Sequence, residues 1–139
     1  MGYIYNRPQA ALFPNKKWYI VTGNGYGSSS QDVGLYLFPL ENIDVVSKLV
    51  AQDSSGTTNG LSGVTLIDSD GDFEVDTGYA GDLKGNLYKF EFTGTPGTPL
   101  STSNISVTKL IAVGEDKPIT TAPDVGRHPN GGYFVYFGT

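Results

Sequence analysis

A short motif occurs three times in the chain, and this repetition limits the possible folds more than any other feature. Its copies read WYIVTGN, DTGYAGD and GYFVYFGT. Their glycines, Gly23, Gly81 and Gly138, are 58 and 57 positions apart. Self-similarity at a nearly fixed period is the sequence signature of a fold built from repeated supersecondary units.

Further segments of strand character surround each copy of the motif. GLYLFPL and GNLYKFEF follow the first two copies and share the pattern Leu-Tyr-x-Phe, while RPQAALF, LSGVTLID and ITTAPDV precede the three copies. DVVSKLV and ISVTKLIA close the first two units. β-Branched and aromatic residues favour strands, and 19 glycines and 8 prolines favour frequent turns. The sequence therefore predicts an all-β protein.

Four short antiparallel strands per unit indicate the blades of a β-propeller. We expect a first blade at about residues 3–52, a second at about 59–113 and the first half of a further blade at about 117–139. Because a propeller typically has at least four blades, these two and a half blades would form part of a larger ring. A β-sandwich with similar hairpins is the alternative fold.

Five carboxylates crowd the loop before the second copy of the motif. Asp68, Asp70, Asp72 and Asp76 fall at positions 1, 3, 5 and 9 of the loop. Glu74 falls at position 7, where Ca²⁺ loops use the backbone carbonyl. Such alternation can direct oxygen ligands to one Ca²⁺ ion, which would also cancel their mutual repulsion. A solvated acidic turn without an ion is the other interpretation.

The loop departs from the full EF-hand pattern at two positions. Phe73 occupies position 6, where EF-hand loops place a glycine for the sharp turn, and a positive φ there would be strained. Tyr79 occupies position 12 in place of the bidentate glutamate. We therefore expect a shortened metal loop, over residues 68–76, that Asp76 closes.

Composition excludes several classes of function. A net charge of −5 disfavours nucleic-acid binding, and no apolar run is long enough for membrane insertion. Without cysteine, neither disulfides nor thiol ligands are available. The amino-terminal residues lack the order of a signal peptide, so an export signal would lie outside this sequence.

Other candidate sites have weaker support. His128 is the only histidine and has no G-x-S-x-G nucleophile elbow to serve, so we predict no catalytic residue and no enzymatic activity. TGNGYGSSS lacks the Lys-Ser/Thr end of a phosphate-binding loop, and AGDLKG indicates a tight turn at Asp82 and Gly85. Exposed tyrosines form a possible carbohydrate platform, namely Tyr3, Tyr5 and Tyr26.

Six segments together resemble the carboxy-terminal propeller of the PilY-type family, the tip-associated adhesins of bacterial type IV pili. These are GYIYNRPQ, WYIVTGNGYG, NGLSGVTLIDSDGDFEVD, YAGDLKGNLYKFEF, PITTAPDVGRHPNGG and FGT, in the family's order over nearly the whole chain. YAGDLKGNLYKF is the most specific, and the family's version differs chiefly in having Trp in place of Tyr88. The resemblance implies a quinoprotein-like propeller, exposed at the pilus tip or outer membrane of a bacterium.

The resemblance also implies a single Ca²⁺ loop that regulates pilus extension and retraction and supports adhesion or twitching motility. Its ligands would be the four aspartates and the main-chain oxygen of Glu74. Partners would be pilus components or host surface ligands, bound through the full-length protein, and exposed edge strands could pair between copies. The alternative is a non-pilus extracellular propeller or carbohydrate-binding module in which Ca²⁺ is only structural. A quinone-dependent enzyme would need cofactor contacts that the sequence does not provide.

Overall fold

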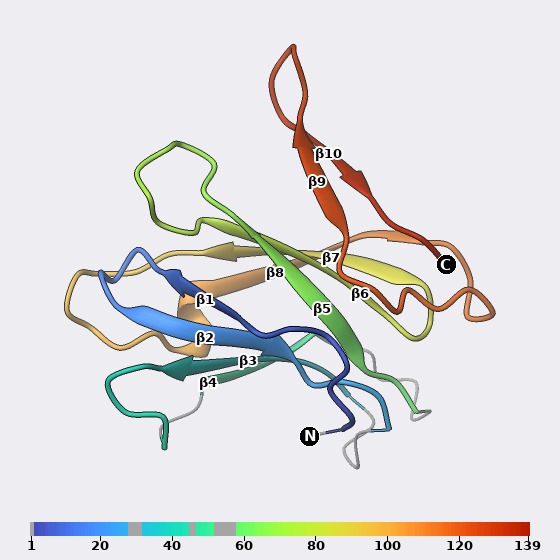
Figure 1. Cartoon of the computed structure of the whole chain (residues 1–139), viewed down its shortest axis with the longest axis horizontal. Helices are drawn as coiled ribbons and strands as arrows, with labels where there is room; N and C mark the ends of the chain where they lie inside the picture. Colours follow the sequence, from blue (N-terminus) through green and yellow to red (C-terminus); the bar gives the residue numbers. More distant parts are fainter. Residues whose placement is uncertain (1, 28–31, 45–46, 52–57) are drawn as a thin grey trace.

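The computed structural model describes residues 2–27, 32–44, 47–51 and 58–139, and its regular structure is almost entirely β (Figure 1). One 3-10 turn, η1 (Thr102–Asn104), precedes the eighth strand. The strands are β1 (Gln9–Leu12), β2 (Trp18–Gly23), β3 (Val33–Pro39), β4 (Ser47–Ala51), β5 (Leu61–Ile67), β6 (Thr77–Asp82), β7 (Asn86–Phe92), β8 (Ile105–Ala112), β9 (Asp124–Arg127) and β10 (Tyr133–Tyr136).

The strands form two four-stranded sheets and a separate hairpin. Strands β1 to β4 make the first sheet in chain order, and β5 to β8 make the second in the same way. The pair β9 and β10 forms a hairpin that projects from the second sheet in Figure 1. All pairings are antiparallel. Four-stranded antiparallel sheets whose neighbouring strands follow one another in the chain agree with the predicted propeller blades.

The hydrophobic core lies between the two four-stranded sheets, where β2 approaches β5. Phe13, Tyr19 and Phe92 meet edge to face, with the Phe13 ring centroid 5.3 Å from that of Tyr19 and 4.9 Å from that of Phe92. Leu61 of β5 and Phe90 of β7 are fully buried in the same cluster. Residues from both sheets therefore share one core, which fixes the second sheet against the first.

The repeated glycine of the motif marks where one unit packs against the next. A Cβ atom on Gly23 would lie 2.2 Å from the backbone oxygen of Ser62, at the start of the second sheet. A Cβ atom on Gly81 would lie 2.2 Å from Cγ2 of Ile119, in the segment leading to the hairpin. Real Cβ atoms do not come this close to other heavy atoms. The 58-residue spacing of these two glycines thus reflects the repeated contact between successive units.

The residue after each of these glycines has a buried polar side chain that organises the following turn. Oδ1 of Asn24 accepts a hydrogen bond of 2.7 Å from the Leu61 amide of the next sheet. The carboxylate of Asp82 is fully buried and well satisfied. Its donors include the backbone amides of Lys84 and Asn86 and the hydroxyl of Tyr88. With Gly85 at a φ of 72°, the predicted AGDLKG turn is confirmed.

The predicted strand ITTAPDV was wrong over most of its length. Residues 119–123 are not a strand, and β9 begins at Asp124. Ile119 is fully buried, and its amide donates to the Asp82 carbonyl at 2.9 Å, which docks the segment on β6 before the hairpin starts. Pro123 has no amide hydrogen and so favours a strand start after it. β10 is also shorter than predicted, because it ends at Tyr136.

Parts of three other expectations fall outside the described residues. These are residues 45–46 of the segment DVVSKLV, the serines that end TGNGYGSSS at 28–30, and the end of the first blade at about residue 52. In the described part of the glycine cluster, Gly25 and Gly27 have φ values of 70° and 66°. These are left-handed conformations, which glycine adopts readily in turns.

Candidate metal centre

The acidic loop connects β5 to β6, the first two strands of the second sheet. Its two ends are held together by the pairing of Ile67 with Thr77 and by a bond of 3.0 Å from the Asp76 amide to the Ile67 carbonyl. The Asp76 carbonyl in turn accepts from the Phe92 amide of β7 at 2.8 Å. The loop thus has a rigid base in the sheet, while its tip projects into solvent.

Three of the predicted ligands come together at this loop. Asp68, Asp70 and Asp76 each offer one carboxylate oxygen, and these three oxygens lie within 4.8 Å of one another. Oxygens bound to one Ca²⁺ at about 2.3–2.6 Å are separated by at most roughly twice that distance. The spacing therefore fits a shared Ca²⁺ ion without rearrangement of the loop backbone.

The fourth predicted aspartate does not join this group. Oδ1 of Asp72 accepts the Glu74 amide at 2.9 Å, and its carboxylate is not among the three that cluster. Glu74 itself is buried, and its side chain pairs with the ammonium group of Lys16 in the turn between β1 and β2. That pairing commits the Glu74 carboxylate to the first sheet, which leaves only its main chain for the metal loop.

Hydrogen bonds within the loop turn its backbone amides toward the carboxylates. The two oxygens of Asp68 accept from the amides of Gly71 at 2.6 Å and Phe73 at 2.8 Å. Oδ1 of Asp70 accepts from the Asp72 amide at 3.2 Å. The loop is thereby curled around its own acidic side chains.

Phe73 has the left-handed conformation that EF-hand loops assign to glycine, with a φ of 70°. The ring is 87% exposed, so no side-chain packing compensates for the backbone strain. A left-handed conformation costs a residue with a Cβ atom roughly 1–2 kcal/mol. The sharp turn at position 6 is therefore present despite the missing glycine.

The loop environment moves the pKa values of two aspartates in opposite directions. The hydrogen bond from the Gly71 amide is the main reason that the pKa of Asp68 is lowered. For Asp70, the hydrogen bond from Asp72 lowers the pKa, but desolvation and repulsion by Asp72, Asp76 and Asp68 outweigh it and leave the pKa raised. The carboxylate of Asp70 thus experiences the uncompensated negative charge of the loop, which is the charge that a cation would neutralise.

Ser69 links the loop to the hairpin of the next unit. Its amide and hydroxyl both donate to Oδ2 of Asp76, at 2.7 Å and 2.6 Å. Its carbonyl accepts from the hydroxyl of Tyr133 at 3.3 Å. On the other side of the loop, the Val75 amide donates to the Leu12 carbonyl of β1 at 2.8 Å. The candidate centre therefore touches the structural units on both sides of it.

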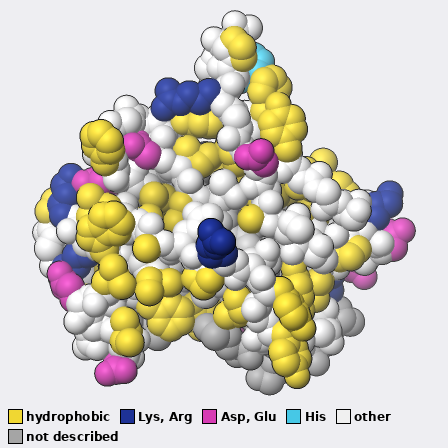
Figure 2. Space-filling model, in the orientation of Figure 1, with side chains coloured by type: hydrophobic (Ala, Val, Ile, Leu, Met, Phe, Trp, Pro, Cys, Tyr) yellow, Lys and Arg dark blue, Asp and Glu magenta, His cyan; other side chains and the backbone are white. Residues whose placement is uncertain are grey.

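The remaining candidate residues show no comparable arrangement. Nδ1 of His128 accepts from the Asn130 amide at 3.1 Å, and its ring packs on Phe134 with centroids 4.6 Å apart. The histidine lies on the projecting hairpin beside a run of hydrophobic side chains (Figure 2). A catalytic histidine would need a nucleophile and an orienting carboxylate instead. The structure therefore gives His128 a packing role.

The three tyrosines proposed as a carbohydrate platform do lie together. The rings of Tyr5 and Tyr26 stack at 5.9 Å, and the ring of Tyr3 is 6.4 Å from that of Tyr5. The hydroxyl of Tyr26 donates to the Thr120 carbonyl, which orders this cluster against the segment before the hairpin. The rings of Tyr3 and Tyr5 are tilted by 30°, and both residues are largely exposed to solvent. Carbohydrate binding at this cluster stays a prediction.

Comparison with known proteins identifies the family. A family model described as the PilY1 beta-propeller domain matches residues 1–139. The chain belongs to the PilY1 β-propeller family. Type IV pilus biogenesis factor PilY1 of Pseudomonas aeruginosa PAO1 is 35% identical and matches the whole chain, and a PilY1 homolog from Xylella fastidiosa Temecula1 is 31% identical. The chain spans 14% and 11% of the length of these relatives.

A solved structure agrees with this membership of the PilY1 family. The crystal structure of the Pseudomonas aeruginosa PilY1 C-terminal domain superimposes with a TM-score of 0.86 at 37% identity. The match covers the whole chain and 32% of that domain, so the chain corresponds to a fragment of the propeller. Within the described residues, no helix is long and apolar enough to cross a membrane.

Proposed function

We propose that residues 68–76 bind one Ca²⁺ ion, and that the chain is the calcium-binding propeller part of a surface-exposed type IV pilus biogenesis factor. The observation that carries the metal proposal is the convergence of Asp68, Asp70 and Asp76 within 4.8 Å. The main chain of Glu74 is the further ligand, and Asp72 is peripheral. Mg²⁺ fits less well, since it demands a stricter octahedron and keeps its waters.

The role in pilus biogenesis rests on family membership and on the position of the loop. Bound calcium would supply a fixed positive charge among the loop carboxylates. The chain's own residues convert that charge into structure, because Ser69 ties Asp76 to the hairpin and Val75 ties the loop to β1. A ligand that binds only the ordered loop stabilises it by about 2.7 kcal/mol at a hundredfold excess over its dissociation constant. We propose that this ordering regulates pilus extension and retraction, and thereby supports adhesion and twitching motility.

Calorimetric titration of calcium tests the metal site. Asp70→Asn should lower calcium affinity roughly tenfold or more, because it removes one ligand charge from the cluster. The asparagine Oδ1 can still accept the Asp72 amide, so the loop backbone keeps this hydrogen bond. Asp72→Asn should have a smaller effect. Asp116→Asn, an exposed carboxylate in the loop after β8, is the matched control and should bind as the wild type does. The proposal is wrong if the wild type takes up no calcium or if the Asp70 variant binds as well as the control.

The pilus role is tested in a bacterium that carries the same changes in the full-length protein. Asp70→Asn should alter surface piliation and twitching motility, and Asp116→Asn should not. The competing role of the loop is a purely structural staple, and its contacts with both neighbouring units are compatible with that role as well. Loss of calcium binding with normal motility and piliation would support that staple and contradict regulation.

A further inference from the structure

A cavity of about 310 Å³ lies between the acidic loop and the turn that joins β9 to β10. Ser69 of the loop forms one wall, and Arg127 and Tyr133 of the hairpin form another. His128, Pro129 and the turn glycines Gly131 and Gly132 complete the lining. Nothing lies within 4 Å of a Cβ atom added to either glycine. The cavity is therefore open on the side of the turn.

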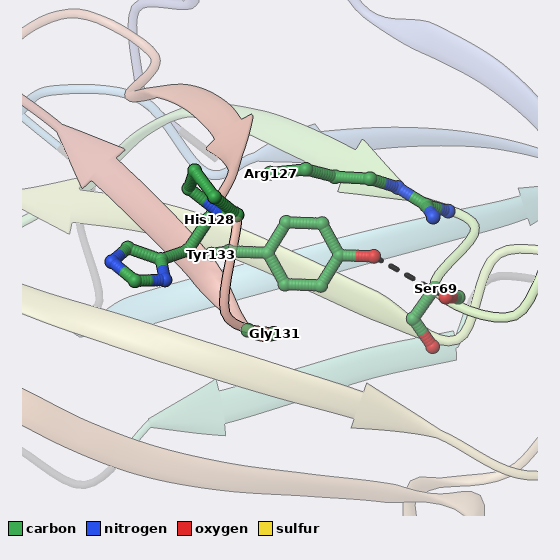
Figure 3. A pocket seen from close by; sticks show the side chains of 7 residues that line it. Ser69, Arg127, His128, Gly131 and Tyr133 are labelled. Carbon is green, nitrogen blue, oxygen red and sulfur yellow. Dashed lines mark hydrogen bonds between the residues drawn. The ribbon is translucent and has the colours of Figure 1, made fainter.

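Register places the two functional side chains of this cavity on one face of the hairpin. Tyr133 and Arg127 are direct partners across β9 and β10. Figure 3 shows both side chains extending toward Ser69, whose carbonyl accepts from the Tyr133 hydroxyl, while His128 points the other way. Within the described residues the guanidinium of Arg127 has no hydrogen bond or ion pair. The cavity thus contains an available cation with a planar array of donors.

We propose that this cavity binds the carboxylate of an acidic peptide side chain, and that it binds more tightly when the adjacent loop holds its calcium. Arginine matches a carboxylate with two parallel hydrogen bonds, which makes that group the best chemical fit. The volume is at the lower end of small-ligand sites, so it suits a single side chain and not a length of polysaccharide.

The calcium dependence follows from the charges around Ser69. Asp68, Asp70 and Asp76 lie next to this residue in the chain or are bonded to it, and without a cation they repel an incoming carboxylate. A divalent ion offsets most of that charge. Ser69 also couples the two sites mechanically, since its amide and hydroxyl hold Asp76 and its carbonyl holds Tyr133. This inference rests on the proposed calcium site.

The test is an NMR titration of the chain with the blocked amino acid N-acetyl-glutamate methylamide, in excess calcium and again in EGTA. In calcium, the amides of Gly131, Gly132 and Tyr133 should shift with a dissociation constant on the order of 1 mM. Affinity should fall at least about fivefold in EGTA, the lower end of ordinary coupling between sites. The neutral glutamine analogue should not bind.

Two variants locate the binding. Arg127→Gln should abolish the shifts, whereas Lys109→Gln, which removes one exposed positive charge from β8, should leave them unchanged. The inference is wrong if the glutamate compound binds equally well with and without calcium, or if Arg127→Gln binds it as the wild type does. Either result can occur while calorimetry still supports the calcium site, so the two proposals are tested separately. Tighter binding of glucuronate than of the glutamate compound would overturn the assignment to a peptide. If calorimetry shows no calcium uptake, the proposed calcium site is refuted, and the calcium dependence of this cavity is refuted with it.

Discussion

Replacing Phe73 by glycine should stabilise the calcium-free chain, which is the opposite of the usual effect of inserting a glycine. The φ of 70° at this residue costs a side chain with a Cβ atom roughly 1–2 kcal/mol, and glycine removes that cost. Glycine also gains freedom in the unfolded chain, which costs about 0.5–1 kcal/mol. Because the ring is 87% exposed, little packing is lost. At the middle of both ranges the net gain is about 0.75 kcal/mol, or about 3 °C in Tm.

Phe73→Ala is the matched control for this change. Alanine also removes the ring but keeps the Cβ atom, so it retains the backbone strain and should leave stability nearly unchanged. Both variants are compared with the wild type by thermal and urea unfolding in EGTA, so that calcium does not contribute. The prediction is wrong if the glycine and alanine variants have equal stability, or if the glycine variant is the less stable of the two. Left-handed strain at position 73 would then not lower the stability of the calcium-free chain.

Two further predictions concern the repeated glycine and the titration of the loop. Gly81→Val should sharply reduce the folded fraction measured by circular dichroism, because its Cβ would lie 2.2 Å from Ile119. Gly138→Val is the control and should be tolerated, because nothing lies within 4 Å of its Cβ position. Calcium affinity by calorimetry should fall as pH drops toward about 4, with Asp70 protonating before Asp68 because their pKa values are raised and lowered respectively. The hydrogen bonds that Asp68 accepts stabilise the loop fully at pH values above the ordinary aspartate pKa. This stabilisation is lost as pH falls through the lowered pKa of Asp68. A calcium affinity that does not change with pH would contradict the assignment of these carboxylates as ligands.

The repeat was sufficient to predict the fold class because its spacing is imposed by packing. Each sheet repeats the same contact, in which the following unit covers the glycine of the motif, as Ser62 does at Gly23 and Ile119 at Gly81. The segments rich in β-branched and aromatic residues then predicted most strands. The strand before the third motif was misplaced, because the buried Ile119 looks like a strand residue in sequence although it docks as part of a loop.

The acidic loop was only partly predictable, since spacing along the chain gives the order of the carboxylates but not their directions. Alternation predicted all four aspartates as ligands, whereas the structure brings oxygens of Asp68, Asp70 and Asp76 together and leaves Asp72 outside this group. The partner of Glu74 was missed. Lys16 precedes it by 58 positions, and this ion pair, between residues of two different sheets, leaves no local signal in the sequence.

These cross-unit contacts explain why a small loop can influence a large fold. On one side the loop is fixed by the Val75 amide to β1, and on the other Ser69 meets Tyr133 of the hairpin. A change in the conformation of this loop would therefore be passed to contacts in both neighbouring units. The carboxylates at the tip repel one another, while the base is held by the sheet. A cation at the proposed site would act on the contacts between the units, and we propose that a pilus partner senses calcium through those contacts.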